Sequence, residues 1–125
     1  AEGGTLIVKS HLPRAVFVGL LKRLALSRGV LVGNSSAALI EAAALKVAAV
    51  DVGTRQNGRE RCGNVIHIDH EYAETVAAAV RKARELDLSS LTHPYGDGRS
   101  GMRIAQLLAE VDPAAPGLLR KRCAY

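Results

Sequence analysis

Four polar residues in the first half of the chain have the types and spacing expected of a site for a phosphorylated ligand. Ser35 and Ser36 end a turn that begins at Gly33, Glu41 follows shortly after, and Arg55 lies beyond the next apolar run. Serine hydroxyls and backbone N–H groups at a helix start bind phosphate oxygens, and arginine binds the same charge through paired hydrogen bonds. A carboxylate only accepts hydrogen bonds, so Glu41 suits the hydroxyl groups of a ribose. The pattern predicts an anion site, with phosphate as the expected group.

Two simpler interpretations of these residues stay open. Turns between a strand and a helix are often capped by serine without binding a ligand. An ion pair between Glu41 and Arg55 would also explain a carboxylate within an otherwise apolar helix, where an unpaired charge is costly. Composition and spacing do not decide between an ion pair and a ligand site.

The elements that must position these residues follow from the hydrophobic pattern. Residues 29–32 and 47–52 are short and rich in β-branched or small apolar residues, which is typical of strands buried on both faces. Residues 37–45 lie between them and are apolar except for Glu41, so we predict one helix that begins at the turn. The positive end of its dipole would then point at the bound anion.

The whole chain is predicted to follow the order β-α-β-α-β-β-α-α. Two further strands are predicted at residues 5–8 and 64–68, and three further helices at residues 13–26, 71–86 and 101–111. This order predicts an α/β fold, namely a Rossmann-like parallel sheet of four strands with helices on both faces. Ligands of such sheets bind at the carboxyl ends of the strands, where the turn and Arg55 are placed.

Longer motifs surround the candidate residues. The sequence contains GNSS at residues 33–36, GTRQNGR at 53–59, GNVI at 63–66 and YGDG at 95–98. Together with Glu41, these motifs resemble the hydrolysing branch of the UDP-N-acetylglucosamine 2-epimerase family over nearly the whole chain. Residues 119–123, LRKRC, resemble the end of the epimerase half of the animal bifunctional sialic-acid enzyme. The chain departs from the pattern at Ala38, where the family often has glycine.

The resemblance implies both an architecture and a ligand. The family has two Rossmann-like halves of the GT-B type that face a cleft, and this chain would be a C-terminal portion of such an enzyme. Residues 1–112 would form the UDP-binding domain and residues 113–125 a basic tail. By the same resemblance, Ser35 and Ser36 would bind the diphosphate, Glu41 the ribose, and Arg55 the charge of the nucleotide.

The resemblance also implies a reaction. The sugar loses its C2 proton, UDP leaves by anti elimination, and water adds to give N-acetylmannosamine and UDP. The groups that act on the sugar belong chiefly to the other half of the enzyme, so we assign no catalytic residue in this chain and expect it to be inactive alone. Two alternatives stay open: a non-catalytic nucleotide-sugar-binding or regulatory module, or the same reaction on a UDP-diacetamido-trideoxyhexose.

The composition of the chain indicates which classes of partner to expect. Its 125 residues are 48% hydrophobic and 23% charged, which is ordinary for one globular domain or part of one. The net charge is +5, but aromatic residues make up only 3%, which argues against single-stranded nucleic-acid binding by stacking. We expect UDP or a UDP-sugar, the missing N-terminal domain and a second copy of the protein as partners, and no nucleic acid or membrane.

Metal and redox chemistry are not indicated by the remaining motifs. His67 and His70 flank Asp69, but further ligands at a convincing spacing are missing from the sequence, so we predict neither a metal nor a cofactor. Cys62 and Cys123 are too few and too far apart for a disulfide framework. Reduced thiols and the lack of 18 consecutive apolar residues favour a cytoplasmic protein.

Overall fold

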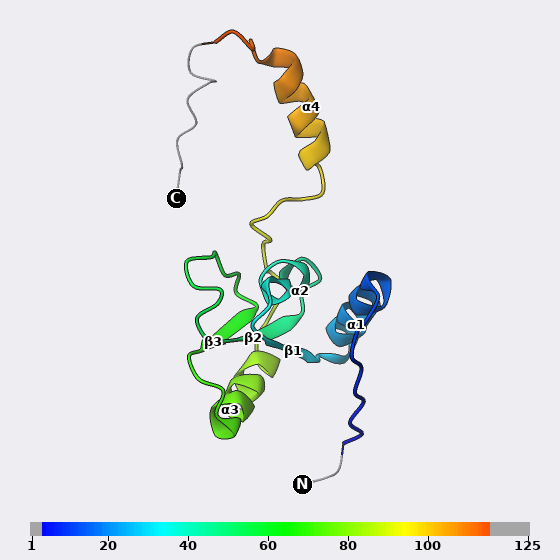
Figure 1. Ribbon diagram of the computed structural model, residues 1–125, viewed down its shortest axis with the longest axis vertical. Helices are drawn as coiled ribbons and strands as arrows, with labels where there is room; N and C mark the ends of the chain where they lie inside the picture. The colour runs from blue at the N-terminus through cyan, green and yellow to red at the C-terminus, as the bar shows by residue number, and fades with distance from the viewer. Residues whose placement is uncertain (1–3, 116–125) are drawn as a thin grey trace. The chain divides into compact units, whose positions relative to one another are not determined.

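The computed structural model describes residues 4–115 (Figure 1). Residues Ala1–Pro94 and Tyr95–Tyr125 form two separate compact units. Residues 116–125, including the LRKRC motif and most of the predicted basic tail, lie outside the described part. The division into a domain over residues 1–112 and a tail over 113–125 therefore stays a prediction.

The first unit is built on a parallel sheet of three strands. These are β1 (Val30–Gly33), β2 (Ala48–Val52) and β3 (Val65–Ile68), in the spatial order β1-β2-β3. In the register of the sheet, Asp51 of the central strand lies between Gly33 and His67. Because the strands are parallel, their carboxyl ends meet at one edge, and the loops that follow them lie side by side.

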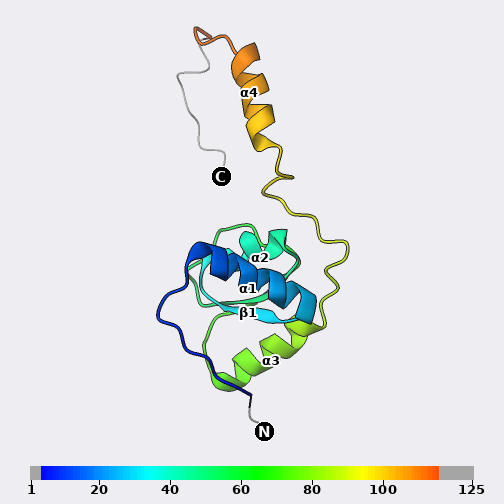
Figure 2. The same cartoon turned by 90° about the vertical axis from the view of Figure 1, so that its right-hand side faces the viewer.

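Helices cover both faces of this sheet. On one face lie α1 (Arg14–Ser27), the 3₁₀ turn η1 (Ser36–Ala38) and α2 (Glu41–Ala44), and on the other lies α3 (Ala73–Arg84). Figure 2 shows α3 on the side of the sheet opposite to α1 and α2. The predicted α/β fold with a parallel sheet and helices on both faces is confirmed.

The alternation of side chains along β2 explains the two cores, because neighbouring residues of a strand face opposite sides of the sheet. The core under α1 and α2 contains Leu21, Ala38, Leu39, Ala42, Val47 and Ala49. The core under α3 contains Ala48, Val50, Ala79 and Ala83. Many of these residues are alanines, so the helices approach the sheet closely and leave little room for a larger side chain.

The strand predicted for residues 5–8 is wrong. These residues form no strand, and Leu6, Ile7 and Val8 are 86%, 75% and 77% exposed. A strand needs a neighbouring chain to accept and donate its backbone hydrogen bonds. The described sheet offers no such neighbour to this segment, because it consists of β1, β2 and β3 alone. An apolar β-branched run predicts a strand but does not supply its partner.

The single helix predicted for residues 37–45 is also wrong, because it is broken into η1 and α2. Asn64 accounts for the break. Its side-chain Nδ2 donates to the carbonyl oxygen of Ala38 at 3.1 Å, which in a continuous α-helix would accept the N–H of Ala42. The same nitrogen donates to the carbonyl of Val47 at 2.9 Å. Asn64 thus fixes the interrupted segment to the start of β2.

Within residues 95–115 of the second unit there is one helix, α4 (Ser100–Glu110), within one residue of the range predicted at each end. Its apolar side chains are exposed within the described residues, and they are Met102, Ile104, Leu107, Leu108 and, after the helix, Val111. In residues 4–115, no helix combines the length and the apolar content needed to cross a membrane.

Candidate functional site

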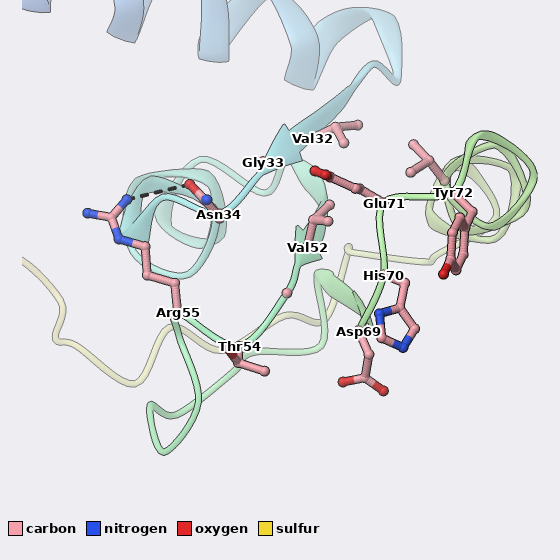
Figure 3. Close-up of a pocket in the computed structure, with 12 residues that line it drawn as sticks. Val32, Gly33, Asn34, Val52, Thr54, Arg55, Asp69, His70, Glu71 and Tyr72 are labelled. Atoms are coloured by element: carbon pink, nitrogen blue, oxygen red, sulfur yellow. Dashed lines mark hydrogen bonds between the residues drawn. The ribbon is translucent and has the colours of Figure 1, made fainter.

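A cavity of about 820 Å³ lies at the carboxyl edge of the sheet (Figure 3). The ends of β1 and β2, the segment that follows β3 and the first part of α3 contribute to its wall. The lining residues are Val32, Gly33, Asn34, Val52, Gly53, Thr54, Arg55, Asp69, His70, Glu71, Tyr72 and Val76. Its size is that of a small-molecule site, and its position is the one expected for ligands of parallel α/β sheets.

Arg55 is joined to the GNSS turn through Asn34. Its Nη1 donates to Oδ1 of Asn34 at 3.5 Å, as Figure 3 shows. Gln56, which is only 4% exposed, donates from Nε2 to the backbone oxygen of Asn34 at 2.9 Å. The loop after β2 and the turn after β1 are therefore held together. The contact with Asn34 occupies one of the five N–H groups of an exposed guanidinium, which leaves Arg55 able to bind an anion.

Ser35 and Ser36 cap and open the 3₁₀ turn. Oγ of Ser35 accepts a hydrogen bond from the backbone N–H of Ala37 at 3.3 Å, so Ser35 caps the 3₁₀ turn η1. Ser35 also lines a small cavity of about 110 Å³ between β1 and α1. Because η1 has only three residues, few peptide dipoles are aligned behind Ser36. An anion at the turn would depend on side chains more than on a helix dipole.

Glu41 begins α2 and already has a cationic partner. Its Oε1 lies 3.4 Å from Nη1 of Arg14, and the two side chains are 28% and 76% exposed. This pair, rather than the pair with Arg55 that the sequence left open, accounts for the carboxylate in an apolar segment. Arg55 instead contacts Asn34. The structure thus brings Arg55 and the turn together, and it places Glu41 beside α1.

A network centred on the buried Asp51 was missed by the sequence analysis. Oδ2 of Asp51 accepts from Arg61 at 3.2 Å (Nε) and 2.8 Å (Nη2), and it lies 3.1 Å from Nδ1 of His67. Nε2 of His67 lies 3.2 Å from Oδ1 of Asp69, and Asp69 lines the cavity. The available signal was a charged residue within an otherwise apolar predicted strand. In residues 4–115, no three His, Cys, Asp or Glu side chains are arranged to hold a metal ion.

Comparison with known proteins decides the family. Residues 6–109 match the family model described as UDP-N-acetylglucosamine 2-epimerase. The chain belongs to this family. It is 37% identical over 115 residues to a Legionella pneumophila protein named UDP-N,N'-diacetylbacillosamine 2-epimerase (hydrolyzing). It is also 51% identical over 41 residues to an Escherichia coli protein named polysialic acid biosynthesis protein P7.

The matches cover only part of each relative. The Legionella match covers 92% of the chain but 29% of the relative, and the E. coli match covers 33% of the chain and 10% of the relative. The chain therefore spans less than a third of the length of the Legionella relative. The predicted membership of the UDP-N-acetylglucosamine 2-epimerase family and the Rossmann-like fold are confirmed, whereas Ser35, Ser36, Glu41 and Arg55 stay predictions as UDP ligands.

Proposed function

We propose that this chain is the UDP-binding portion of a hydrolysing UDP-sugar 2-epimerase. The observation that carries the proposal is the contact between Arg55 and Asn34. It joins the motifs at residues 33–36 and 53–59 at the carboxyl edge of the sheet, beside a cavity large enough for a nucleotide. Both motifs contain groups that bind phosphate, so their junction is the place for the diphosphate.

Each candidate residue has a distinct role in this proposal. The hydroxyls of Ser35 and Ser36 donate to the diphosphate, and the guanidinium of Arg55 neutralises its charge. Glu41 accepts hydrogen bonds from the ribose hydroxyls. An exposed ion pair contributes about 1 kcal/mol or less, so the ribose can replace the exposed Arg14 beside Glu41 at little cost.

The reaction belongs to the full-length protein. The sugar loses its C2 proton and UDP departs by anti elimination, which leaves a 2-acetamidoglucal; addition of water to this glucal gives N-acetylmannosamine. Arg55 stabilises the negative charge on the departing UDP. We assign no proton-transfer residue in this chain, and we place those groups in an N-terminal half that faces this one in a GT-B-type arrangement. We further propose a cytoplasmic homo-oligomer whose isolated C-terminal portion binds UDP without turning over substrate.

Two sugars are candidates for the substrate. UDP-N-acetylglucosamine is the substrate in the family description that matches residues 6–109. A UDP-diacetamido-trideoxyhexose is the second candidate, because the Legionella relative is named for UDP-N,N'-diacetylbacillosamine. Comparing UDP release from both sugars by the full-length protein separates them. Saturable binding of the sugars without UDP release would instead support a non-catalytic binding module.

The test of the UDP site is a calorimetric titration of the 125-residue chain with UDP, with Ser36→Ala and Arg55→Ala beside the unchanged protein. Loss of a charge-assisted hydrogen bond costs about 1.5–3 kcal/mol, so we expect Arg55→Ala to weaken binding about tenfold or more. Arg59→Ala is the matched control, because Arg59 belongs to the same loop but does not line the cavity. Absence of saturable binding by the folded chain, or an equal effect of Arg59→Ala, would contradict the proposal.

A further inference from the structure

Asp51 is a fully buried carboxylate at the carboxyl end of the central strand. Its residue exposure is 0%, and it lies in register between Gly33 of β1 and His67 of β3. Such a group is costly to bury unless cations and donors compensate for its lost hydration. Arg61 and His67 supply that compensation, both at the same carboxylate oxygen.

Stability alone does not explain a carboxylate at this position. Oδ1 of Asp51 is buried and has no hydrogen-bond partner in the described chain, which carries a further cost. A buried ion pair is often no more stabilising than apolar side chains of similar volume. The neighbouring positions of β2 are filled by small apolar residues, so an apolar residue would suit the sheet. The reason for a carboxylate at this position is therefore to be found in the contacts that Asp51 makes, rather than in its contribution to the core.

Through Arg61, Asp51 closes the base of the loop that carries Arg55. This loop leaves β2 at Gly53 and ends before β3, and Arg61 lies near its far end. Both Nε and Nη2 of Arg61 donate to Asp51, and Nη2 also lies 3.4 Å from Oδ1 of Asn57 within the loop. The other end of the loop is fixed to the GNSS turn by Arg55. The loop is thus held at both ends.

Through His67, Asp51 also holds the opposite wall of the cavity. The imidazole lies between two carboxylates, with Nδ1 at 3.1 Å from Asp51 and Nε2 at 3.2 Å from Asp69. Asp69 begins the segment that lines the cavity after β3. One buried carboxylate therefore connects the loop of Arg55 on one side of the cavity with Asp69 on the other. Asp51 itself does not line the cavity.

We propose that Asp51 is a positioning residue of the nucleotide site, which fixes the loop of Arg55 and the segment at Asp69 relative to each other. The identity of the ligand rests on the proposed function. The contacts of Asp51 with Arg61 and His67 do not depend on it. It predicts that loss of the Asp51 charge changes UDP binding without removing any group that touches the nucleotide.

The test compares Asp51→Asn with Val50→Ala in UDP titrations of the 125-residue chain. Asparagine keeps the shape of the side chain but removes its charge. Val50 is equally buried on the other face of β2, so its truncation destabilises the sheet without touching the network. A binding loop that must be ordered on association binds more weakly than a preorganised one, and we expect Asp51→Asn to weaken UDP binding about tenfold. Unchanged affinity in Asp51→Asn, or equal weakening in Val50→Ala, would overturn the proposal.

Amide chemical shifts measured in the absence of ligand separate this proposal from the proposed function. In Asp51→Asn we expect shifts at residues 53–63 and at Asp69, with loss of a slowly exchanging Nε–H signal of Arg61. If the unchanged chain binds no UDP, the UDP site fails, but these shifts still support the positioning role, and their absence overturns it. Should Asp51→Asn not fold, Arg61→Gln breaks the same contact from a side chain that is 26% exposed, with the same expected loss of UDP affinity and the same shifts at residues 53–63 and at Asp69.

Discussion

Glu41 Oε1 lies 3.4 Å from Nη1 of Arg14, an ion pair that joins the first residue of α2 to the first residue of α1. Glu41 therefore has a protein partner in the absence of nucleotide. Because Arg14 is largely exposed, solvent screens this attraction, and a ligand can compete with it. The pair offers a way to test the ribose role of Glu41 separately from the binding of phosphate.

We predict that Glu41→Gln weakens the binding of UDP more than the binding of inorganic pyrophosphate, since pyrophosphate has no ribose. Loss of hydrogen bonds to a charged acceptor corresponds to an affinity change of about tenfold or more for UDP. Competition titrations with both ligands provide the measurement. Arg14→Ala is the control, because it removes the ion pair but keeps the carboxylate, and we expect it to retain UDP binding. Equal weakening of both ligands by Glu41→Gln would argue against the ribose role.

The local sequence pattern was sufficient to predict the strands of the sheet and the edge at which they end. The runs that became β1 and β2 are short, apolar and separated by a helical segment, which implies parallel pairing. A loop joins β2 to β3, and these strands also pair in parallel. The junction of Arg55 with the GNSS turn followed from the same reasoning, because the carboxyl ends of neighbouring parallel strands meet.

The features that the sequence did not predict depend on contacts between distant residues. The break between η1 and α2 depends on Asn64, whose side chain reaches the carbonyl of Ala38 from a loop far along the chain. The pairing of Asp51 with Arg61 and His67 depends on how the loop after β2 returns to the sheet. Helical and strand propensities describe single segments, so they contain no information on either contact.

Two glycines in or next to α1 should respond to alanine in opposite directions. At Gly19, inside the helix, an added Cβ would meet no atom within 4 Å, so Gly19→Ala should stabilise the chain by about 0.5–1 kcal/mol. At Gly29, an added Cβ would overlap Cδ2 of Leu24 and lie 3.3 Å from its Cα. Gly29→Ala should therefore destabilise the chain by about 1 kcal/mol or more.

Urea unfolding of both variants, followed by circular dichroism, gives the free energies of unfolding. The two substitutions add the same methyl group, so each serves as the control for the other. A destabilised Gly19→Ala would mean that α1 packs more closely around residue 19 than the structure shows. An unchanged Gly29→Ala would mean that the Leu24 side chain moves aside freely.

The start of α4 should loosen in acid. Nη1 and Nη2 of Arg103 donate to the Asp97 carboxylate, at 2.9 Å and 2.7 Å, and the backbone N–H of Arg99 adds a third donor. These hydrogen bonds lower the pKa of Asp97 below its usual value. A lowered pKa in the folded state means that the contact stabilises α4 above the pKa of an unfolded aspartate, and that this contribution is lost as the pH falls through the lowered value.

Amide hydrogen exchange of residues 97–104 between about pH 5 and pH 2 should therefore show falling protection at the start of the helix, after correction for the intrinsic exchange rate. Arg103→Gln should remove most of this pH dependence while leaving the first unit of the chain unaffected. If the protection of the unchanged protein is constant over this range, the ion pair contributes nothing to α4 in solution.

The thiol of Cys62 should react slowly in the folded protein. Burial raises the pKa of this thiol, and the negative charge of Glu60 raises it further; the residue is 8% exposed. A raised pKa leaves less thiolate at a given pH, and the thiolate is the reactive form.

In a Cys123→Ser background, where Cys62 is the remaining cysteine of the 125 residues, we expect modification by a disulfide reagent at pH 8 to be much slower than modification of free cysteine. In urea the rate should approach that of the free amino acid, and Glu60→Gln should increase the folded-state rate only modestly, because burial is the larger cause. Modification of folded Cys62 as fast as free cysteine would show that the loop before β3 opens readily, which would also contradict the closed loop base assigned to Asp51 and Arg61.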